Sequence, residues 1–147
     1  MSISRLMPIL VVALAGCATM GGLREDPLNA GKSRHFEAPF VRVVDAARQS
    51  MIDAKLQIEE AYRPSPGTQV LLAKKGTSFW SWGELVRVVV VEGRDETDPT
   101  IVRVLSKRKS GLNFAAKGDY SEAIFSGIEL GLIAEDPSAD EASDMGP

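Results

Sequence analysis

Apolar and polar residues follow two different periods between positions 35 and 133. Phe40, Val44, Ala47 and Met51 recur three or four residues apart, which predicts a helix that begins at Pro39 and ends near residue 55. Proline suits the first turn of a helix because its missing N–H has no intrahelical partner there. Five other stretches have the alternation or the β-branched content of strands, and they lie at 35–37, 56–63, 68–75, 84–92 and 100–109.

A second helix is predicted at the end of this region. Asp119 and Glu122 have the three-residue spacing of a capping box. The apolar positions that follow at helical spacing are Ile124, Phe125, Ile128 and Leu132. The element order β-α-β-β-β-β-α predicts an α+β fold, a two-layer domain in which two helices cover one face of an antiparallel sheet of four to five strands.

Glycines mark positions where the backbone is expected to turn or to approach a neighbour closely. Gly127 and Gly131 form a GxxxG pattern, and the charges on that short helix favour packing on the sheet over dimerisation in a membrane. Gly83 precedes the most apolar strand, where it is expected to adopt a conformation that other residues resist. Residues 64–67, with the sequence PSPG, predict a turn.

The first 17 residues carry a targeting pattern. Arg5 precedes an apolar run at 6–15, which is shorter than the roughly 20 residues that a helix needs to cross a bilayer. The run ends in Leu14-Ala15-Gly16-Cys17, which resembles the lipobox of bacterial lipoproteins. The resemblance implies that residues 1–16 are a signal peptide, that Cys17 carries a diacylglyceryl group, and that lipid ties the chain to a membrane.

The residue after the cysteine bears on which membrane this is. The family's sorting rule retains proteins with aspartate at this position in the inner membrane, and Ala18 stands there instead. The resemblance therefore implies a lipid anchor in the outer membrane and a domain that faces the periplasm. The alternative is an ordinary signal peptide in which Cys17 is incidental.

Irregular, polar segments flank the predicted domain at 35–133. Residues 17–34 combine the lipidated cysteine with Gly, Pro, Asn and charges without an apolar period, which predicts a flexible tether. The segment 134–147 holds five acids and no base, which predicts a disordered tail. Residues 18–134 hold 16 basic and 15 acidic residues, so the domain is close to neutral and nucleic acid is not expected as a partner.

An aromatic cluster lies directly before the most apolar strand. Phe79, Trp80 and Trp82 fall within four positions, and such residues are enriched on surfaces that grip a partner. The functional hypothesis is an aromatic rim that contacts a protein, a lipid or a glycan. The alternative is a loop that folds back and closes the open end of the core.

The strand at 84–92 is apolar on both faces, although helices are expected on only one. Arg87 and Val89 lie on the second face, and Arg103 and Lys107 share one parity on the next strand. This mixed basic and apolar face is a candidate docking surface for a protein partner. The alternative is that the aromatic loop or the tether covers it.

The residues give no indication of an enzyme, a metal site or a cofactor. Cys17 is the only cysteine and His35 the only histidine, which leaves no histidine-based triad and no multi-ligand site of these residues within the chain. Glu59 and Glu60 are adjacent in a predicted strand and point to opposite faces, so they cannot flank one substrate.

The whole pattern resembles small envelope lipoproteins of Gram-negative bacteria. Ser81-Trp82-Gly83-Glu84, followed by Val102, Val104 and Ser106-Lys107, is similar to the helix-grip domain of the lipoprotein C component of the outer-membrane β-barrel assembly machine. That component has two such domains where this chain has one. The resemblance implies a non-enzymatic scaffold that docks an envelope protein. The alternative is a binding module that holds a small apolar or lipid ligand between sheet and helices.

Overall fold

The computed structural model describes residues 18–76, 83–95, 97–108 and 119–134. Its fold is α+β, as the sequence predicts, with a five-stranded antiparallel sheet in the order β1-β5-β4-β3-β2. The strands are β1 (Lys32–Phe36), β2 (Gln57–Ser65), β3 (Thr68–Lys75), β4 (Glu84–Val91) and β5 (Thr100–Arg108). The helices are α1 (Met20–Glu25), α2 (Phe40–Asp53) and α3 (Ser121–Ala134). No helix in these ranges is long and apolar enough to cross a membrane.

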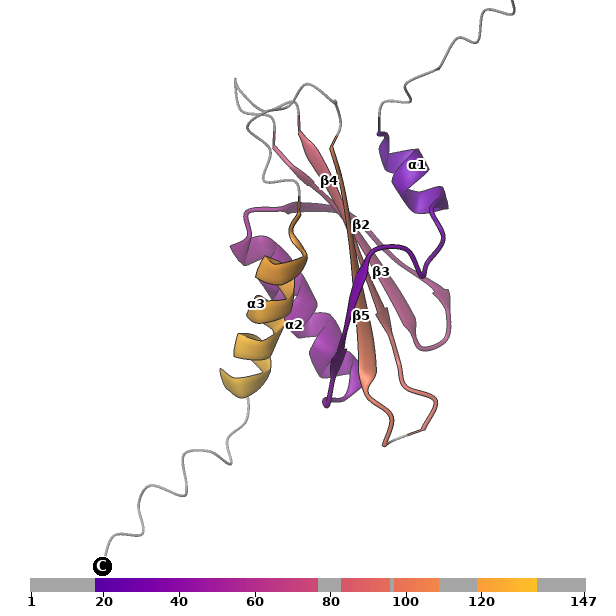
Figure 1. Cartoon of the computed structure of the whole chain (residues 1–147), viewed down its shortest axis with the longest axis vertical. Helices are drawn as coiled ribbons and strands as arrows, with labels where there is room; N and C mark the ends of the chain where they lie inside the picture. The colour runs from indigo at the N-terminus through magenta and orange to yellow at the C-terminus, as the bar shows by residue number, and fades with distance from the viewer. Residues whose placement is uncertain (1–17, 77–82, 96, 109–118, 135–147) are drawn as a thin grey trace, which may run out of the picture.

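Helices α2 and α3 cover one face of the sheet, which confirms the predicted two-layer arrangement (Figure 1). One cluster of buried apolar residues joins them to the strands. Val88 and Val104 enter this cluster from the two central strands, while Met51 and Ile128 enter it from the helices. Burial of these side chains is the main source of stability for such a domain.

The GxxxG pattern packs against α2 and not against the sheet, so that prediction is wrong in its partner. A Cβ atom added at Gly127 would lie 2.8 Å from Ser50 Cβ, and one added at Gly131 would lie 3.4 Å from Ala46 Cβ. Ser50 Oγ donates a hydrogen bond of 2.9 Å to the carbonyl of Ile124. The missing side chains let the two helices approach closely over the sheet.

The opposite face of the sheet carries a helix where the sequence predicts only a flexible tether. Thr19 caps α1 by accepting a 3.0 Å hydrogen bond from the Gly22 N–H. Leu23 is fully buried against Val70 and Val89, so the prediction for residues 18–34 is wrong in this part. Helix α1 is too short to show a period, and its helical state depends on packing against the sheet.

Two predicted backbone features are confirmed. Gly67 has φ +69° in the turn between β2 and β3, and Gly83 has φ +91° directly before β4. Strand β2 extends through Pro64, which an edge strand tolerates because no further strand needs its N–H. Strand β1 begins at Lys32, earlier than predicted, because it pairs with β5 from Val104 onward.

Candidate functional site

The strand register brings four of the predicted site residues onto one face of the sheet. Val89 lies opposite Arg103, and Leu85 lies opposite Lys107. Arg87 lies two residues from both Leu85 and Val89 along β4, so its side chain is on the same face of the sheet. The predicted mixed basic and apolar surface is therefore assembled by the fold. We call it the second face, defined by Leu85, Arg87, Val89, Arg103 and Lys107.

The second face is covered and does not form the predicted open docking surface. Arg87 and Val89 are both 0% exposed, and Arg103 is half-buried. Leu23 of α1 closes over the apolar part, and its full burial contributes about 2 kcal/mol to keeping the helix in place. The alternative that the N-terminal segment covers this face is what the structure shows.

Arg87 fastens α1 to the sheet through three backbone carbonyls. Its Nη1 donates to the carbonyls of Leu23 at 3.0 Å and Asp26 at 2.7 Å, and its Nη2 donates to that of Pro27 at 2.7 Å. Carbonyls at the end of a helix have no intrahelical hydrogen-bond donor, and here the guanidinium donates to them. Burial lowers the pKa of Arg87, yet a guanidinium keeps its charge in proteins, which suits the negative end of the helix dipole.

Two ion pairs at the edges of α1 add to this contact between α1 and the sheet. Lys107 Nζ lies 2.5 Å from Asp26 Oδ2, so the predicted partner-binding lysine already has a partner within the chain. Arg24 pairs with Glu60 at 2.9 Å and stacks 4.8 Å from the centre of the Tyr62 ring. The exposed Arg24–Glu60 pair contributes less than about 1 kcal/mol, whereas the Lys107–Asp26 pair is partly buried.

The remaining predicted site residues lie outside the described ranges. These are the lipobox Leu14, Ala15, Gly16 and Cys17, and the aromatic Phe79, Trp80 and Trp82. The described elements on either side of these segments are as follows in the chain. Helix α1 begins three residues after Cys17, and the aromatic segment joins the end of β3 to the start of β4.

A buried polar cluster lies where β4 begins. The Tyr120 hydroxyl donates a short hydrogen bond to Glu84 Oε2, and Lys75 Nζ lies 5.4 Å from the centre of the Tyr120 ring. Burial and the Glu84 carboxylate both raise the pKa of Tyr120. The Tyr120 N–H donates to Ser106 Oγ at 3.2 Å. The cluster joins the start of α3 to the sheet, and sequence reasoning missed it because its members are far apart along the chain.

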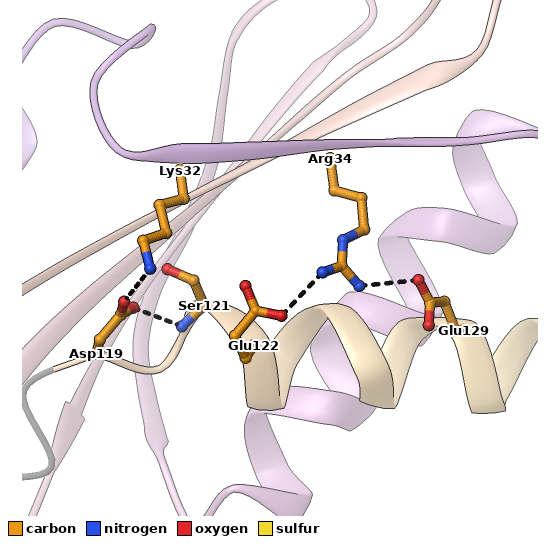
Figure 2. A network of polar contacts seen from close by, with 6 residues as sticks. All are labelled: Lys32, Arg34, Asp119, Ser121, Glu122 and Glu129. Atoms are coloured by element: carbon orange, nitrogen blue, oxygen red, sulfur yellow. Dashed lines mark hydrogen bonds and ion pairs between the residues drawn. The ribbon is translucent and has the colours of Figure 1, made fainter.

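A second polar network fastens the edge strand β1 to α3 (Figure 2). Lys32 Nζ lies 2.6 Å from Asp119 Oδ2, and Asp119 Oδ1 accepts the Ser121 N–H at 2.9 Å. Asp119 is therefore the predicted cap of α3. The hydrogen bonds from Lys32 and Ser121 lower the pKa of Asp119 to about 2, and the same carboxylate raises the pKa of Lys32.

Arg34 makes the other half of that network. It donates to Glu122 and Glu129, each at 2.9 Å, and its guanidinium lies 4.7 Å from the centre of the Phe125 ring. The predicted capping box is thus only half formed, because the Glu122 carboxylate turns to Arg34 on the neighbouring strand. These contacts are structural: every charged group shown in Figure 2 has a partner within the chain.

An open pocket of about 530 Å³ lies at the other end of the sheet, beside the β4–β5 connection. Its charged lining is acidic and consists of Glu37, Glu92, Asp95 and Asp98. In residues 18–76, 83–95, 97–108 and 119–134, no group of three or more His, Cys, Asp and Glu residues is arranged to hold a metal ion.

The space between the sheet and its two larger helices is filled by side chains. Val88 and Ile128, which would line a ligand cleft there, are both 0% exposed and belong to one continuous core cluster.

Comparison with known protein families and with curated protein sequences finds no match to the chain.

Proposed function

We propose that this chain is a non-enzymatic lipoprotein of the outer membrane, anchored through Cys17, whose domain faces the periplasm and docks an envelope protein. The lipobox pattern at residues 14–17 supports the anchor. The observation that supports the proposal most is that helix α1 is packed on the second face. Ala18, the residue directly after Cys17, packs against the second face together with Met20.

This arrangement changes how such an anchor works. A free segment of 17 residues would hold a domain about 20–25 Å from its attachment point. Here the chain is already part of the fold one residue after the anchored cysteine. Two or three acyl chains at Cys17 then hold the domain at the bilayer surface, because each buried methylene group contributes about 0.8 kcal/mol.

With the second face covered, a protein partner meets the outer surfaces of α2 and α3. Leu130 and Ile133 of α3 are each 68% exposed, and Val41 of α2 is 64% exposed. Both helices lie on the side of the sheet opposite α1 (Figure 1). Their exposure supports docking of a partner with a complementary apolar surface.

Crosslinked pull-down from intact envelopes tests both parts of the proposal. The native chain is expected to fractionate with the outer membrane and to recover a specific envelope protein, whereas Cys17→Ser is expected in the soluble periplasmic fraction. The Leu130→Ser/Ile133→Ser variant should stay on the membrane and lose that protein. The matched control is Arg48→Ser, an exposed polar position of α2 that should change neither result.

The two parts fail separately. Unchanged membrane association of Cys17→Ser would contradict the lipid anchor. Recovery of the same protein by the native chain and by Leu130→Ser/Ile133→Ser would contradict docking through α3.

A further inference from the structure

The fold fixes which end of the domain meets the bilayer, given the proposed anchor at Cys17. Figure 1 shows the start of α1 at the end of the sheet where β4 begins. At this end the register aligns Lys75, Glu84 and Arg108 across β3, β4 and β5. We call it the anchor-side end. Because consecutive Cα atoms are about 3.8 Å apart, Cys17 cannot move far from Ala18, which is packed on the fold.

The charges at the anchor-side end match an anionic surface. The acid that lies between Lys75 and Arg108 in the register, Glu84, is 3% exposed and bonded to Tyr120, and Asp26 pairs with Lys107. Among the described residues, no carboxylate forms an ion pair with Lys75 or Arg108. Arg108 is exposed, and Lys75 is half-buried with its ammonium beside the Tyr120 ring, so neither positive charge is neutralised by a described carboxylate and both can meet lipid headgroups.

The opposite end carries the reverse charge. Glu37, Glu92, Asp95 and Asp98 line the open pocket there, and none of them has an ion pair within the described part of the chain. Helix α3 also ends on this side of the domain (Figure 1). An anionic bilayer attracts one end of the molecule and repels the other.

We propose that the anchor-side end is a membrane-contact surface, in which Lys75 and Arg108 bind the headgroups of anionic lipids and the acidic pocket points away from the bilayer. This inference rests on the proposed lipid anchor. Strands of eight residues separate the two ends by about 26 Å, so the orientation is measurable. Each basic residue close to such a surface shifts the equilibrium about fivefold toward contact.

The experiment uses the lipidated full chain in vesicles of phosphatidylcholine with phosphatidylglycerol and a headgroup nitroxide lipid. One fluorophore is placed at Gly76→Cys, where an added Cβ meets nothing within 4 Å, and in a separate sample at the exposed Thr97→Cys near the acidic pocket. The acylated Cys17 does not react with a thiol probe. The Gly76 label is expected to be strongly quenched and the Thr97 label to be weakly quenched.

Charge variants show whether headgroup binding causes this difference. Arg108→Glu, alone and with Lys75→Gln, is expected to reduce quenching of the Gly76 label severalfold while the chain stays on the vesicles. Arg94→Glu makes the same charge change at the far end and should leave quenching unaltered. Replacing phosphatidylglycerol by phosphatidylcholine should reduce quenching as Arg108→Glu does. Because this replacement leaves the protein unchanged, the same loss of quenching in both experiments shows that charge, and not misfolding of the variant, is the cause.

Three results would overturn the inference. Equal or stronger quenching of the Thr97 label on vesicle-bound chain contradicts the orientation and leaves the anchor intact. Quenching that ignores Arg108→Glu and the vesicle charge contradicts the role of anionic lipid. A chain that does not stay on the vesicles at all contradicts the lipid anchor and the inference together.

Discussion

Arg87 has the most consequential environment of any single residue in the described chain. It is fully buried, carries a positive charge, and donates to three carbonyls, that of Leu23 in the last turn of α1 and those of the two residues that follow the helix, Asp26 and Pro27. Hydrogen bonds from a charged donor contribute roughly 1.5–3 kcal/mol each, but the carbonyls regain water if α1 detaches. The net effect of Arg87 is therefore limited by the free energy with which α1 docks.

Arg87→Met should loosen α1 without unfolding the sheet. Met fills a similar volume and donates no hydrogen bond, so we expect the free energy of unfolding to fall by about 1–3 kcal/mol. Denaturant unfolding followed by tryptophan fluorescence and circular dichroism measures the change. The matched control is Arg103→Met, on the same face but only half-buried, which should cost less. An Arg87→Met domain as stable as the native one would contradict this contact between Arg87 and α1.

Gly127 and Gly131 differ in the room they leave, although both belong to the same pattern. Gly127→Ala places a methyl group against Ser50, and we expect it to destabilise the domain by about 1–3 kcal/mol through overpacking. Gly131→Ala meets only the Ala46 methyl at 3.4 Å, and the higher helix propensity of Ala should stabilise it by up to about 1 kcal/mol. Thermal unfolding of both variants gives the comparison, and equal effects would contradict the helix packing.

At the scale of elements, the sequence predicts those that have a period of their own. Helices α2 and α3 and all five strands were recognisable because each carries a local signal, either a regular spacing of apolar residues or a run of β-branched ones. Helix α1 was not, since Gly21 and Gly22 are poor helix formers and only Leu23 is fully buried. Its structure depends on a face of the sheet far away in the sequence, which no local pattern records.

Helix α1 should therefore open on its own. The Leu23 and Asp26 amides, which bond to the carbonyls of Thr19 and Gly22, are expected to exchange with solvent by local detachment of α1. Amides of the central strand β4, including that of Val88, should exchange only on global unfolding. Hydrogen exchange of the native chain measures both. Equal protection of α1 and β4 would show that α1 belongs to the global folding unit.

The contact between β1 and α3 should weaken in acid. Asp119 has a folded-state pKa of about 2 against an ordinary value of 3.8, so its ionised form stabilises the fold. This contribution is complete above pH 4 and is lost as the pH falls toward 2. Because the Asp119 side chain is 45% exposed, we expect its ionised form to contribute about 1 kcal/mol or less to the free energy of unfolding. Unfolding free energies between pH 5 and 2 should fall less steeply for Asp119→Asn, and parallel curves for the two proteins would contradict this.

At the scale of the whole molecule, the predicted fold is confirmed and the predicted site is only partly assembled. The strand parity correctly placed Arg87, Val89, Arg103 and Lys107 on one face. Parity says nothing about what covers a face, so the cover provided by α1 could not be predicted from it. Part of the segment expected to be a tether instead closes the second face, which would shorten the reach of the proposed anchor.

Lipid on Cys17 is the premise on which the short reach, the membrane contact and the proposed role all depend. The mass of the N-terminal tryptic peptide of the chain purified from envelopes tests it most directly, since trypsin cuts after Arg24. We expect a peptide of residues 17–24 whose mass includes a diacylglyceryl thioether on Cys17 and an acyl group on its amine. A peptide with an unmodified thiol, or a chain cut at another position, would contradict the anchor.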